Sequence, residues 1–592
     1  MEQHLKYFKK NVLEEIHNGI EMKAYDFMYD INRDHLDDIS MSYFGSKITY
    51  GELFKKIEKC ASALTALGIG KGDIITFVLP NIPEIVYLFY AVNRIGAIAN
   101  MIDPRTNASA IMERTNVTNS KLLFVISDIA DDKIYDYADN YKTERIIIIT
   151  PADAFSKRKG LTAEAIGVKA IYKIKNYKSA SCYITFQEFI NNAGIEIKDS
   201  AYKADEPASI VYTSGTSGGI AKGVMLSNMA MNSMHRQQMS GQEGFDRQNT
   251  FLGCIPFFSA YGSMNGMHNS LCNGWNIQMI PKFNPNEFDM LIKKYKPNNS
   301  LAVPRFWESL VDNGRLEKMD FSFLILPTIG GDKISPASVN KINHFFETHG
   351  SKVKVIIGYG ATEFGGAVSV TLSNYDIYKE GSVGVFFPEC VAKIFDPDTG
   401  EEITGDERTG ELYLHSTTMM LGYYNNKSET DAITYYDENG LKFYKTGDKV
   451  RVDKDGINWV IDRYKRVMMR PDGHTVGASP IENVIMSHDQ VSNCAVVGIP
   501  LDDKGGVIPT AFIRLKDGVK GSHKEIIESI DNLCFKELPE REKALSYVIV
   551  DKLPYTLMGK IDYRQLETYT FDNKAIFVKD PLFDNIDIPE KE

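Results

Sequence analysis

The stretch YTSGTSGGIAKGVMLSN, residues 212–228, follows the apolar segment ASIV and leads into a second apolar run. A glycine-rich turn after a strand brings backbone N–H groups and small hydroxyls together, and such an arrangement suits anionic oxygens. A mobile surface loop between a strand and a helix fits the same residues equally well. The residues that would make a phosphate site are Thr213, Ser214, Gly215, Thr216, Ser217, Gly218 and Lys222.

The loop differs from the two familiar phosphate-binding patterns. A Walker A loop needs GxxxxGK followed by Ser or Thr, whereas Lys222 follows an alanine and precedes Gly223. The GxGxxG pattern of dinucleotide-binding folds is also missing from this stretch. Other parts of the chain must therefore decide what the loop does.

Short apolar runs alternate with helical patterns along the chain. Runs such as DIITFVLPN from residue 73 and KLLFVIS from residue 121 are typical of buried strands. Apolar residues between positions 53 and 64 recur at the spacing of one helix face, and Thr49 with Glu52 predicts a capping box at the start of that helix. The alternation predicts α/β layers with largely parallel sheets through about the first 400 residues.

The pattern changes after about residue 380. Short alternating runs separated by DENG and KDG indicate hairpins and antiparallel pairing, and a new α+β stretch begins after IDRYKR. We therefore expect an α/β fold with two domains. Residues 1–464 would form a large N-terminal domain of layered α/β sheets with a β-barrel-like subdomain, and residues 465–592 a small, mobile α+β domain.

Composition excludes several classes of function. The net charge of −11, with scattered basic residues, argues against a nucleic-acid partner. The seven cysteines are odd in number and include no CxxC pair, which indicates a reducing compartment and not a disulfide framework or zinc site. The charged N-terminus does not resemble a signal peptide, and no window approaches the ~20 apolar residues of a membrane span. We expect a cytoplasmic protein without an integral membrane segment.

Five further segments follow the opening loop in order. They are GYGATE (358–363), GELYLHSTTMMLGYYNN (410–426), YKTGD (444–448), VIDRYKR (460–466) and PYTLMGK (554–560). Together with the loop they resemble the adenylate-forming superfamily, which includes acyl-CoA synthetases of the AMP-dependent synthetase and ligase family, aryl-CoA ligases, firefly luciferase and nonribosomal peptide adenylation domains. Six such motifs in order, over roughly residues 40–570, make the resemblance specific.

The resemblance implies a reaction in two halves. A carboxylate attacks the α-phosphate of ATP, which releases pyrophosphate and forms an acyl-adenylate, and the thiol of CoA then displaces AMP. Because the carboxylate and ATP are both anionic, the site must supply positive charge and fixed hydrogen-bond donors. The implied cofactors and partners are ATP, Mg²⁺, CoA and a small carboxylic acid.

Lys560 of the last motif is implied to bridge the carboxylate and the α-phosphate as the catalytic lysine. Thr362 and Glu363 match the positions that place the metal ion and the phosphates, and Thr216 is a second implied metal contact. A carboxylate is a suitable oxygen ligand for Mg²⁺. A helix N-terminus with Thr as its cap and Glu in its first turn explains the same two residues.

Other positions match the family's nucleotide site. Asp448 is implied to accept hydrogen bonds from both ribose hydroxyls, and Arg463 to donate to the ribose, although either could instead form a structural salt bridge. Lys465 falls at the family's hinge, about which the C-terminal domain rotates between the half-reactions. The remaining implied nucleotide and thiol-side residues are Gly331, Asp332, Gly358, Tyr359, Gly360, Ala361 and Gly473.

Three features depart from the family pattern. The opening loop is one residue longer and lacks the proline before Lys222. Ser259 of IPFFSAYG occupies the position of a usual histidine. Asp472 precedes Gly473 where CoA ligases often have a lysine, which weakens the assignment of CoA unless Arg470 substitutes.

The implied acyl pocket is apolar and has several small side chains, which leave room for a medium- or long-chain fatty acid. Its residues are Phe258, Ser259, Ala302 and Gly365. The FFSAYG segment has no acidic residue to bind a substrate amine, so an amino acid is disfavoured.

Three alternatives to a fatty acyl-CoA ligase stay open: an aryl acid as substrate, transfer to the phosphopantetheine of an acyl carrier protein, and a non-catalytic acyl or nucleotide sensor. The joint presence of Lys560, Glu363 and Asp448 argues against the sensor, because a sensor could lose any one of them.

Overall fold

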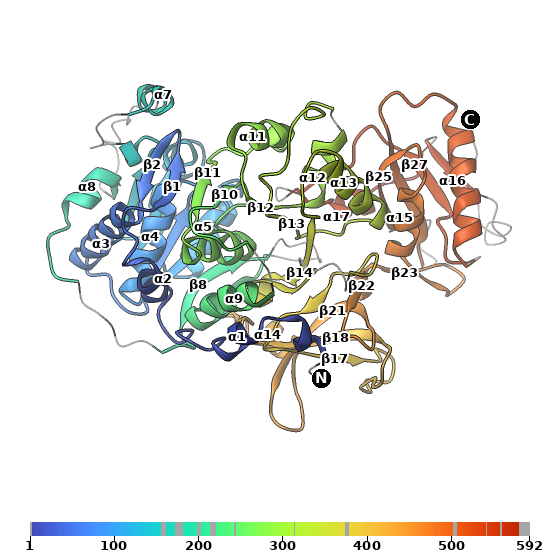
Figure 1. Cartoon of the computed structure of the whole chain (residues 1–592), viewed down its shortest axis with the longest axis horizontal. Coiled ribbons are helices and arrows are strands. Elements are labelled where there is room, and N and C mark those ends of the chain that lie inside the picture. The colour runs from blue at the N-terminus through green and yellow to red at the C-terminus, as the bar shows by residue number, and fades with distance from the viewer. Residues whose placement is uncertain are drawn as a thin grey trace.

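Two large sheets, an open five-stranded antiparallel sheet, and a four-stranded and a two-stranded sheet in the C-terminal region build the described part of the protein (Figure 1). The computed structural model describes residues 3–155, 161–171, 182–197, 200, 203–213, 221–241, 244–312, 314–372, 378–500, 506–539, 541–556, 559–572 and 574–578.

The first sheet has eight strands, and its central strands are parallel, as the apolar runs predicted. At the β19 edge of the sheet the pairing is antiparallel, and β8 and β9, on either side of the opening loop, form one hairpin. In spatial order the strands are β19 (Gly422–Tyr423), β9 (Gly223–Ser227), β8 (Pro207–Tyr212), β4 (Ile98–Met101), β3 (Ile74–Val78), β5 (Leu122–Ile126), β6 (Arg145–Ile149) and β7 (Tyr183–Thr185).

The second sheet has nine strands and is parallel through its centre, with antiparallel strands at its two edges. In spatial order they are β16 (Val385–Phe386), β15 (Gly366–Val370), β14 (Ile356–Ala361), β13 (Leu326–Ile329), β12 (Asn299–Ala302), β10 (Thr250–Gly253), β11 (Asn276–Met279), β1 (Ile39–Tyr43) and β2 (Ser46–Thr49).

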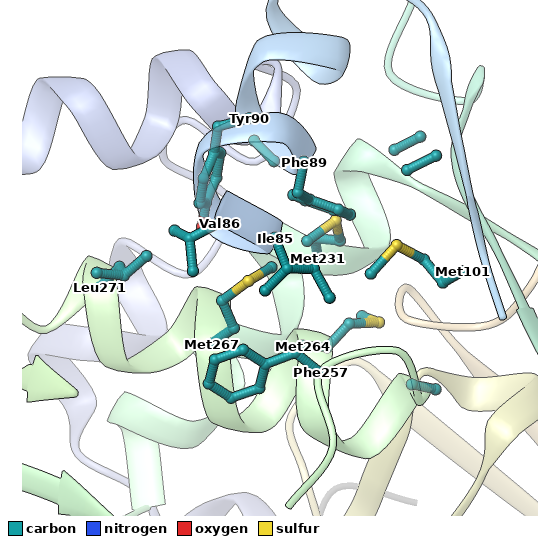
Figure 2. Close-up of a cluster of buried hydrophobic side chains, with 14 of the residues drawn as sticks. Ile85, Val86, Phe89, Tyr90, Met101, Met231, Phe257, Met264, Met267 and Leu271 are labelled. Atoms are coloured by element: carbon teal, nitrogen blue, oxygen red, sulfur yellow. The ribbon is translucent and has the colours of Figure 1, made fainter. Parts of the chain in front are cut away.

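The largest hydrophobic cluster joins both sheets. Helix α4 (Pro83–Arg94) belongs to it and is buried along almost its whole length, as expected of a helix that is apolar on all sides. Figure 2 shows Ile85, Val86 and Phe89 of α4 close to methionines of α9 (Asn228–Gly241) and of the helical segment η5 (Tyr261–His268). Flexible Met side chains fill the irregular space between these helices.

The remaining helices pack around the two large sheets or flank the C-terminal sheet (Figure 1). They are α1 (Lys10–Glu14), α2 (Ala24–Asn32), α3 (Tyr50–Ala66), α5 (Ala108–Val117), α6 (Ser127–Ile129), α7 (Ala163–Ile171), α8 (Phe186–Asn191), α10 (Asn269–Cys272), α11 (Phe288–Tyr295), α12 (Pro304–Asp312), α13 (Pro336–Thr348), α14 (Lys427–Ile433), α15 (Ala478–Met486), α16 (His523–Glu537) and α17 (Tyr563–Glu567).

The hairpin-rich region forms an antiparallel sheet, as the alternating pattern predicted. Along β18, buried and partly exposed residues alternate, because one face of the sheet packs on the core. Its strands are β17 (Cys390–Phe395), β18 (Arg408–Ser416), β20 (Thr434–Tyr436), β21 (Lys442–Val452) and β22 (Asn458–Arg463).

The C-terminal region has hydrophobic clusters of its own, built from residues after 467. It lies to one side of the large sheets (Figure 1). Its strands are β23 (Val467–Met469), β24 (Thr475–Gly477), β25 (Val491–Ile499), β26 (Ile508–Leu515), β27 (Ser546–Ile549) and β28 (Ala575–Phe577). The boundary at residue 464/465 stays a prediction.

All seven cysteines are free thiols, and the sequence had predicted no disulfide framework. Within the described ranges, no helix has the length and apolar character needed to cross a membrane.

The capping box at the start of α3 has the predicted geometry. Thr49 Oγ1 accepts a hydrogen bond from the backbone N–H of Glu52 at 3.2 Å, and Glu52 Oε2 accepts from the N–H of Thr49 at 3.0 Å.

Substitution Thr49→Ala removes one half of this box and should destabilise the helix start by about 1 kcal/mol. We expect amide hydrogen exchange in the first turns of α3 to become roughly five-fold faster, measured on peptides by mass spectrometry. Thr65→Ala, near the other end of the same helix, is the control. Unchanged exchange at the α3 N-terminus would contradict the prediction.

Candidate active site

A cavity of about 140 Å³ opens where the parallel strands β13 and β14 reach their carboxyl ends. Ligands of open α/β sheets bind at this edge, because the loops that follow the strands converge there. The predicted residues that line it are Gly331, Gly358, Tyr359, Gly360, Ala361, Thr362 and Lys560. The fold thus brings the last motif next to motifs about 200 residues earlier in the chain.

Asp448 is held by two hydrogen bonds at this site. The Tyr359 hydroxyl donates to Oδ2 at 2.6 Å, and Arg463 Nε donates to Oδ1 at 2.7 Å. Asp448 and Arg463 face each other because β21 and β22 pair antiparallel in that register. Asp448 is only 2% exposed, so these charge-assisted contacts replace the water that the carboxylate loses.

The same contacts set the protonation of the neighbours. Burial, reinforced by the adjacent Asp448 carboxylate, raises the pKa of Tyr359 well above its ordinary value, so the phenol keeps its proton and remains a donor. Asp448 also raises the pKa of Arg463. Each carboxylate oxygen has a second lone pair, so Asp448 can still accept hydrogen bonds from a ligand.

Glu363 lies in the short turn η7 (Thr362–Phe364), where its Oε1 accepts a hydrogen bond from the Tyr423 hydroxyl at 2.8 Å. The N-cap of this turn is Ala361, which makes no side-chain hydrogen bond. Thr362 therefore does not cap a helix, and the capping interpretation of the Thr-Glu pair does not describe this structure.

Tyr423 connects Glu363 with the opening loop. Lys222 Nζ lies 4.8 Å from the centroid of the Tyr423 ring and forms an ion pair with Glu429. The pairing of β19 with β9 produces this contact, because it sets Tyr423 opposite Val224. Sequence reasoning missed Tyr423 as a site residue, although it lies within the quoted segment 410–426.

The base of the opening loop is closed by Thr213 and Lys222. The N–H of Thr213 donates to the carbonyl of Lys222, and the N–H of Lys222 donates to Thr213 Oγ1, both at 3.1 Å. These two bonds keep the ends of the loop together beside β8 and β9. Ser214, Gly215, Thr216, Ser217 and Gly218 lie outside the described residues.

Lys560 reaches the cavity from a tight turn in the C-terminal region. The backbone N–H of Thr556 donates to the carbonyl of Lys560, and Gly559 has a φ of +83°, which the turn requires. Burial lowers the pKa of Lys560, and the Asp332 carboxylate partly offsets this effect. Burial also raises the pKa of Asp332, against the influence of Lys560.

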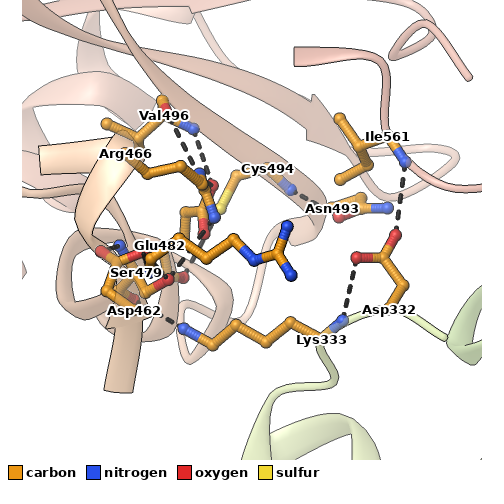
Figure 3. A network of polar contacts seen from close by, with 11 residues as sticks. Asp332, Lys333, Asp462, Arg466, Ser479, Glu482, Asn493, Cys494, Val496 and Ile561 are labelled. Carbon is orange, nitrogen blue, oxygen red and sulfur yellow. Dashed lines mark hydrogen bonds and ion pairs between the residues drawn. The ribbon is translucent and has the colours of Figure 1, made fainter. Parts of the chain in front are cut away.

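Polar contacts hold the C-terminal region against the large sheets (Figure 3). Asp332 Oδ2 accepts a hydrogen bond from the N–H of Ile561 at 3.3 Å, and Lys333 Nζ donates to the carbonyl of Ser479 at 3.2 Å. Both residues directly follow Gly331. Asp332, implied as a nucleotide residue, therefore also holds the segment that carries Lys560.

The chain around the predicted hinge is tied to the C-terminal helix α15. Ser479 donates to Asp462 through its backbone N–H at 2.9 Å and its hydroxyl at 3.0 Å, and Arg466 pairs with Glu482 at 2.6 Å. Lys465 lies between them in the short turn Tyr464–Arg466. Its role as the hinge stays a prediction.

The residues predicted for the acyl pocket lie near the cavity but do not line it. Ser259 Oγ donates to the carbonyl of Pro256 at 2.8 Å within its own loop, and Ala302 is fully buried in a hydrophobic cluster behind the cavity residues Tyr261 and Leu301. Phe258 is buried beneath the Arg105 guanidinium, and Gly365 ends the turn η7 with a φ of +70°. Gly473 lies between β23 and β24, also away from the lining.

Other residues take their place on the cavity wall. Tyr261 belongs to FFSAYG and begins η5, Asn265 follows on the same helical segment, and Gly366 is the neighbour of Gly365. The Tyr261 hydroxyl and Asn265 Nδ2 are buried and have no hydrogen-bond partner among the described residues. Sequence reasoning missed both, although the quoted segment ends one residue after Tyr261.

Two family models match the chain. One, described as AMP-binding enzyme, covers residues 29–424, and the other, described as AMP-binding enzyme C-terminal domain, covers residues 480–560.

Proteins of similar sequence include a probable 4-coumarate–CoA ligase 1 of Dictyostelium discoideum, which is 30% identical over 479 residues, or 80% of this chain and 82% of that protein. A long-chain-fatty-acid–CoA ligase of Bacillus subtilis (strain 168) is 27% identical over 552 residues, or 91% of this chain and 93% of that protein. Among solved structures, ATP-bound MatB from Rhodopseudomonas palustris has a TM-score of 0.76 at 21% identity, covering 92% of this chain and 98% of that one.

Substitution Lys333→Met keeps the length of the side chain but removes its hydrogen bond to Ser479, so the C-terminal region should leave the large sheets more often. We expect several-fold faster tryptic cleavage after Lys465 or Arg466, followed by mass spectrometry. The control is Lys341→Met, which removes the exposed ion pair with Asp312. Equal cleavage rates in the two variants would show that Lys333 does not hold this arrangement.

Proposed function

The chain belongs to the AMP-binding enzyme family and is an AMP-forming acid–thiol ligase of the acyl-CoA synthetase type, and we propose that it converts a medium-chain fatty acid or an aryl acid into its CoA thioester. The observation that carries the proposal is Lys560, which lines the same cavity as Gly331, Tyr359 and Thr362 although it comes from the other end of the chain. This is the arrangement that joining a carboxylate to a nucleotide phosphate requires.

Lys560 and Asp448 divide the recognition of the reactants between them. Lys560 supplies positive charge where the carboxylate and the α-phosphate meet, and it acts strongly because the site is buried. Asp448, fixed by Tyr359 and Arg463, accepts the ribose hydroxyls through its remaining lone pairs. The lysine thus meets an α-phosphate that is already oriented.

Glu363 is suited to hold Mg²⁺. Within the described residues, no group of three His, Cys, Asp or Glu side chains could hold a metal ion, so a closed metal cage is absent from that part of the chain. Mg²⁺ commonly takes one or two carboxylates together with substrate phosphates and water, which fits a single glutamate. Bound there, the ion would neutralise phosphate charge. Tyr423 orients Glu363 through its hydroxyl.

The cavity length supports a medium-chain or aryl acid over a long-chain one. The lining runs from Gly330 back to Leu326 along one strand, about 13 Å at the usual rise per residue. A fully extended long-chain fatty acid is longer than this. Phe245, Phe251 and Trp275 line the far part, and such aromatic side chains pack well against a flat ring, so the aryl acid is a second candidate.

CoA is the proposed acceptor, and Arg470 is the basic residue three positions before Gly473 that could meet its phosphates. Arg470 is 2% exposed, pairs with Asp472 at 3.2 Å and donates to the carbonyl of Arg541. It is therefore occupied within the protein in this arrangement of the domains. A carrier-protein phosphopantetheine, which lacks the nucleotide part of CoA, remains the alternative acceptor.

A pyrophosphate-release screen tests the proposal directly. We expect release that depends on acid with straight-chain acids of intermediate length or with aryl acids, little with amino acids, and thioester formation when CoA is added. AMP formation that needs a carrier protein in place of CoA would favour the alternative acceptor. Nucleotide binding without any acid-dependent turnover would contradict the ligase and indicate a sensor.

Substitution Lys560→Ala should slow acyl-adenylate formation roughly 100- to 1,000-fold, because a buried charge that stabilises the transition state is lost. Thioester formation from a supplied acyl-adenylate should stay near the wild-type rate, since the lysine serves the first half-reaction. Lys552→Ala, an exposed lysine of the same region, is the control. Pyrophosphate release near the wild-type rate in Lys560→Ala would overturn the assignment.

The lowered pKa of Lys560 predicts an alkaline limit on adenylation. The protonated form is the active one, so kcat/KM should fall as pH rises through a pKa below the ordinary lysine value of about 10.4. In Lys560→Arg the guanidinium stays charged, and this limb should disappear even if the maximal rate is lower. If kcat/KM falls at the same alkaline pH in the wild type and in Lys560→Arg, the fall reports the titration of another group.

A further inference from the structure

The far end of the cavity lies at the amino ends of the strands whose carboxyl ends carry the active site. Register pairing sets Phe251, Asn299 and Leu326 side by side on β10, β12 and β13, and all three line the cavity. Trp275, just before β11, and Phe245 complete this end. An acid bound with its carboxylate at Lys560 therefore places its opposite end among these residues.

Several side chains of the cavity wall carry buried polar atoms without partners among the described residues, and Asn299 and Trp275 are the two that lie at this end with polar atoms on an amide and an indole. Asn299 and Trp275 are each 2% exposed. Asn299 Nδ2, Asn299 Oδ1 and Trp275 Nε1 have no hydrogen-bond partner among the described residues. Buried polar groups are nearly always paired, so three such atoms on one cavity wall indicate a ligand that pairs with them.

The neighbouring Asn298 differs from Asn299, because both polar atoms of its side chain are hydrogen-bonded within the protein. Asn298 Nδ2 donates to the carbonyl of Phe323 at 3.1 Å, and its Oδ1 accepts from the N–H of Thr250 at 2.9 Å. That amide serves the sheet itself. The amide of Asn299, one residue later and on the other side of the strand, serves no such purpose within the protein.

Packing holds both groups in position. The Trp275 indole stacks on Phe245, with ring centroids 5.6 Å apart and an interplanar angle of 10°. Asn299 belongs to a strand that is paired on both sides, with Phe251 and with Leu326. Neither side chain can easily turn to solvent, so the donors and the acceptor are pre-organised for whatever enters.

We propose that this end of the cavity recognises a hydroxyl group at the far end of the acid, a substrate class that rests on the proposed ligase function. Trp275 Nε1 and Asn299 Nδ2 offer two donors, and Asn299 Oδ1 offers one acceptor, which matches a hydroxyl that accepts two hydrogen bonds and donates one. An acid ending in a methyl group offers these atoms no hydrogen bond and would leave all three unpaired.

The neutral character of the wall argues against a charged end group. The described residues at this end, Gln238, Phe245, Trp275 and Asn299, carry no formal charge, and burying an ammonium or a second carboxylate beside them is costly. The hydroxyl can come from a phenolic ring or from the end of an alkyl chain. Both present the same group to Asn299, and they differ in the part that spans the cavity.

The test compares kcat/KM for pyrophosphate release with matched pairs of acids. One pair is an aryl acid with and without a ring hydroxyl at the end opposite the carboxylate, and the other is a medium-chain acid with and without a terminal hydroxyl. We expect roughly a ten- to hundred-fold preference for the hydroxylated member of at least one pair. The pair that shows it identifies the source of the hydroxyl.

Substitutions of Asn299 and Trp275 test whether these two side chains cause the preference for the hydroxylated acid. Asn299→Leu and Trp275→Phe should each reduce kcat/KM for the hydroxylated acid roughly ten-fold or more and leave its unhydroxylated partner unchanged or improved. Asn340→Leu, an exposed asparagine on α13, should leave the preference as it is in the wild type.

Outcomes for this inference and for the ligase function are separable. Equal kcat/KM within both pairs for the wild-type protein, or an unchanged preference in both variants, would overturn the hydroxyl-recognition proposal and leave the ligase intact. No acid-dependent pyrophosphate release with any acid would overturn the ligase function itself. The comparison of acids on the wild-type protein does not depend on the folding of any variant.

Discussion

Completion of the cavity depends on contacts that hold the C-terminal region in place, and two of these contacts come from the segment after Gly331. Asp332 binds the backbone beside Lys560, and Lys333 binds the start of α15, so two consecutive residues of the large domain fix the position of a turn more than 200 residues away. Both contacts are single polar interactions between two regions whose hydrophobic clusters are separate. Such an interface can be rearranged without disturbing either core.

Burial gives the charged groups of the site their chemical character. Lys560 loses water when it enters the cavity, which lowers its pKa, and the same loss makes its charge effective on an approaching anion. Asp448 differs from Lys560 because its buried charge has hydrogen-bond partners within the protein. Its carboxylate is almost completely buried but is compensated by Tyr359 and Arg463, so it can remain a fixed acceptor.

The far end of the cavity differs from the end near Lys560 in the hydrogen bonding of its buried side chains. Where Asp448 and Glu363 lie, the carboxylates accept hydrogen bonds from Tyr359, Arg463 and Tyr423. At the amino ends of β11 and β12, three polar atoms on Asn299 and Trp275 have no partner among the described residues. We propose that the first region holds the nucleotide and that the second leaves its hydrogen bonds to the acid, which distinguishes one substrate from another.

The sequence by itself determined the α/β class, the capping box of α3, the antiparallel region and the order of the six motifs, because these depend on local periodicity and on residues close together in the chain. It also indicated which motifs share one site. Only the tertiary structure decided that Tyr423 orients Glu363 and that Asn299 faces the cavity while Asn298 does not. Which face of a strand meets a cavity depends on register and on how two sheets pack, and these long-range pairings leave no local signal in the sequence.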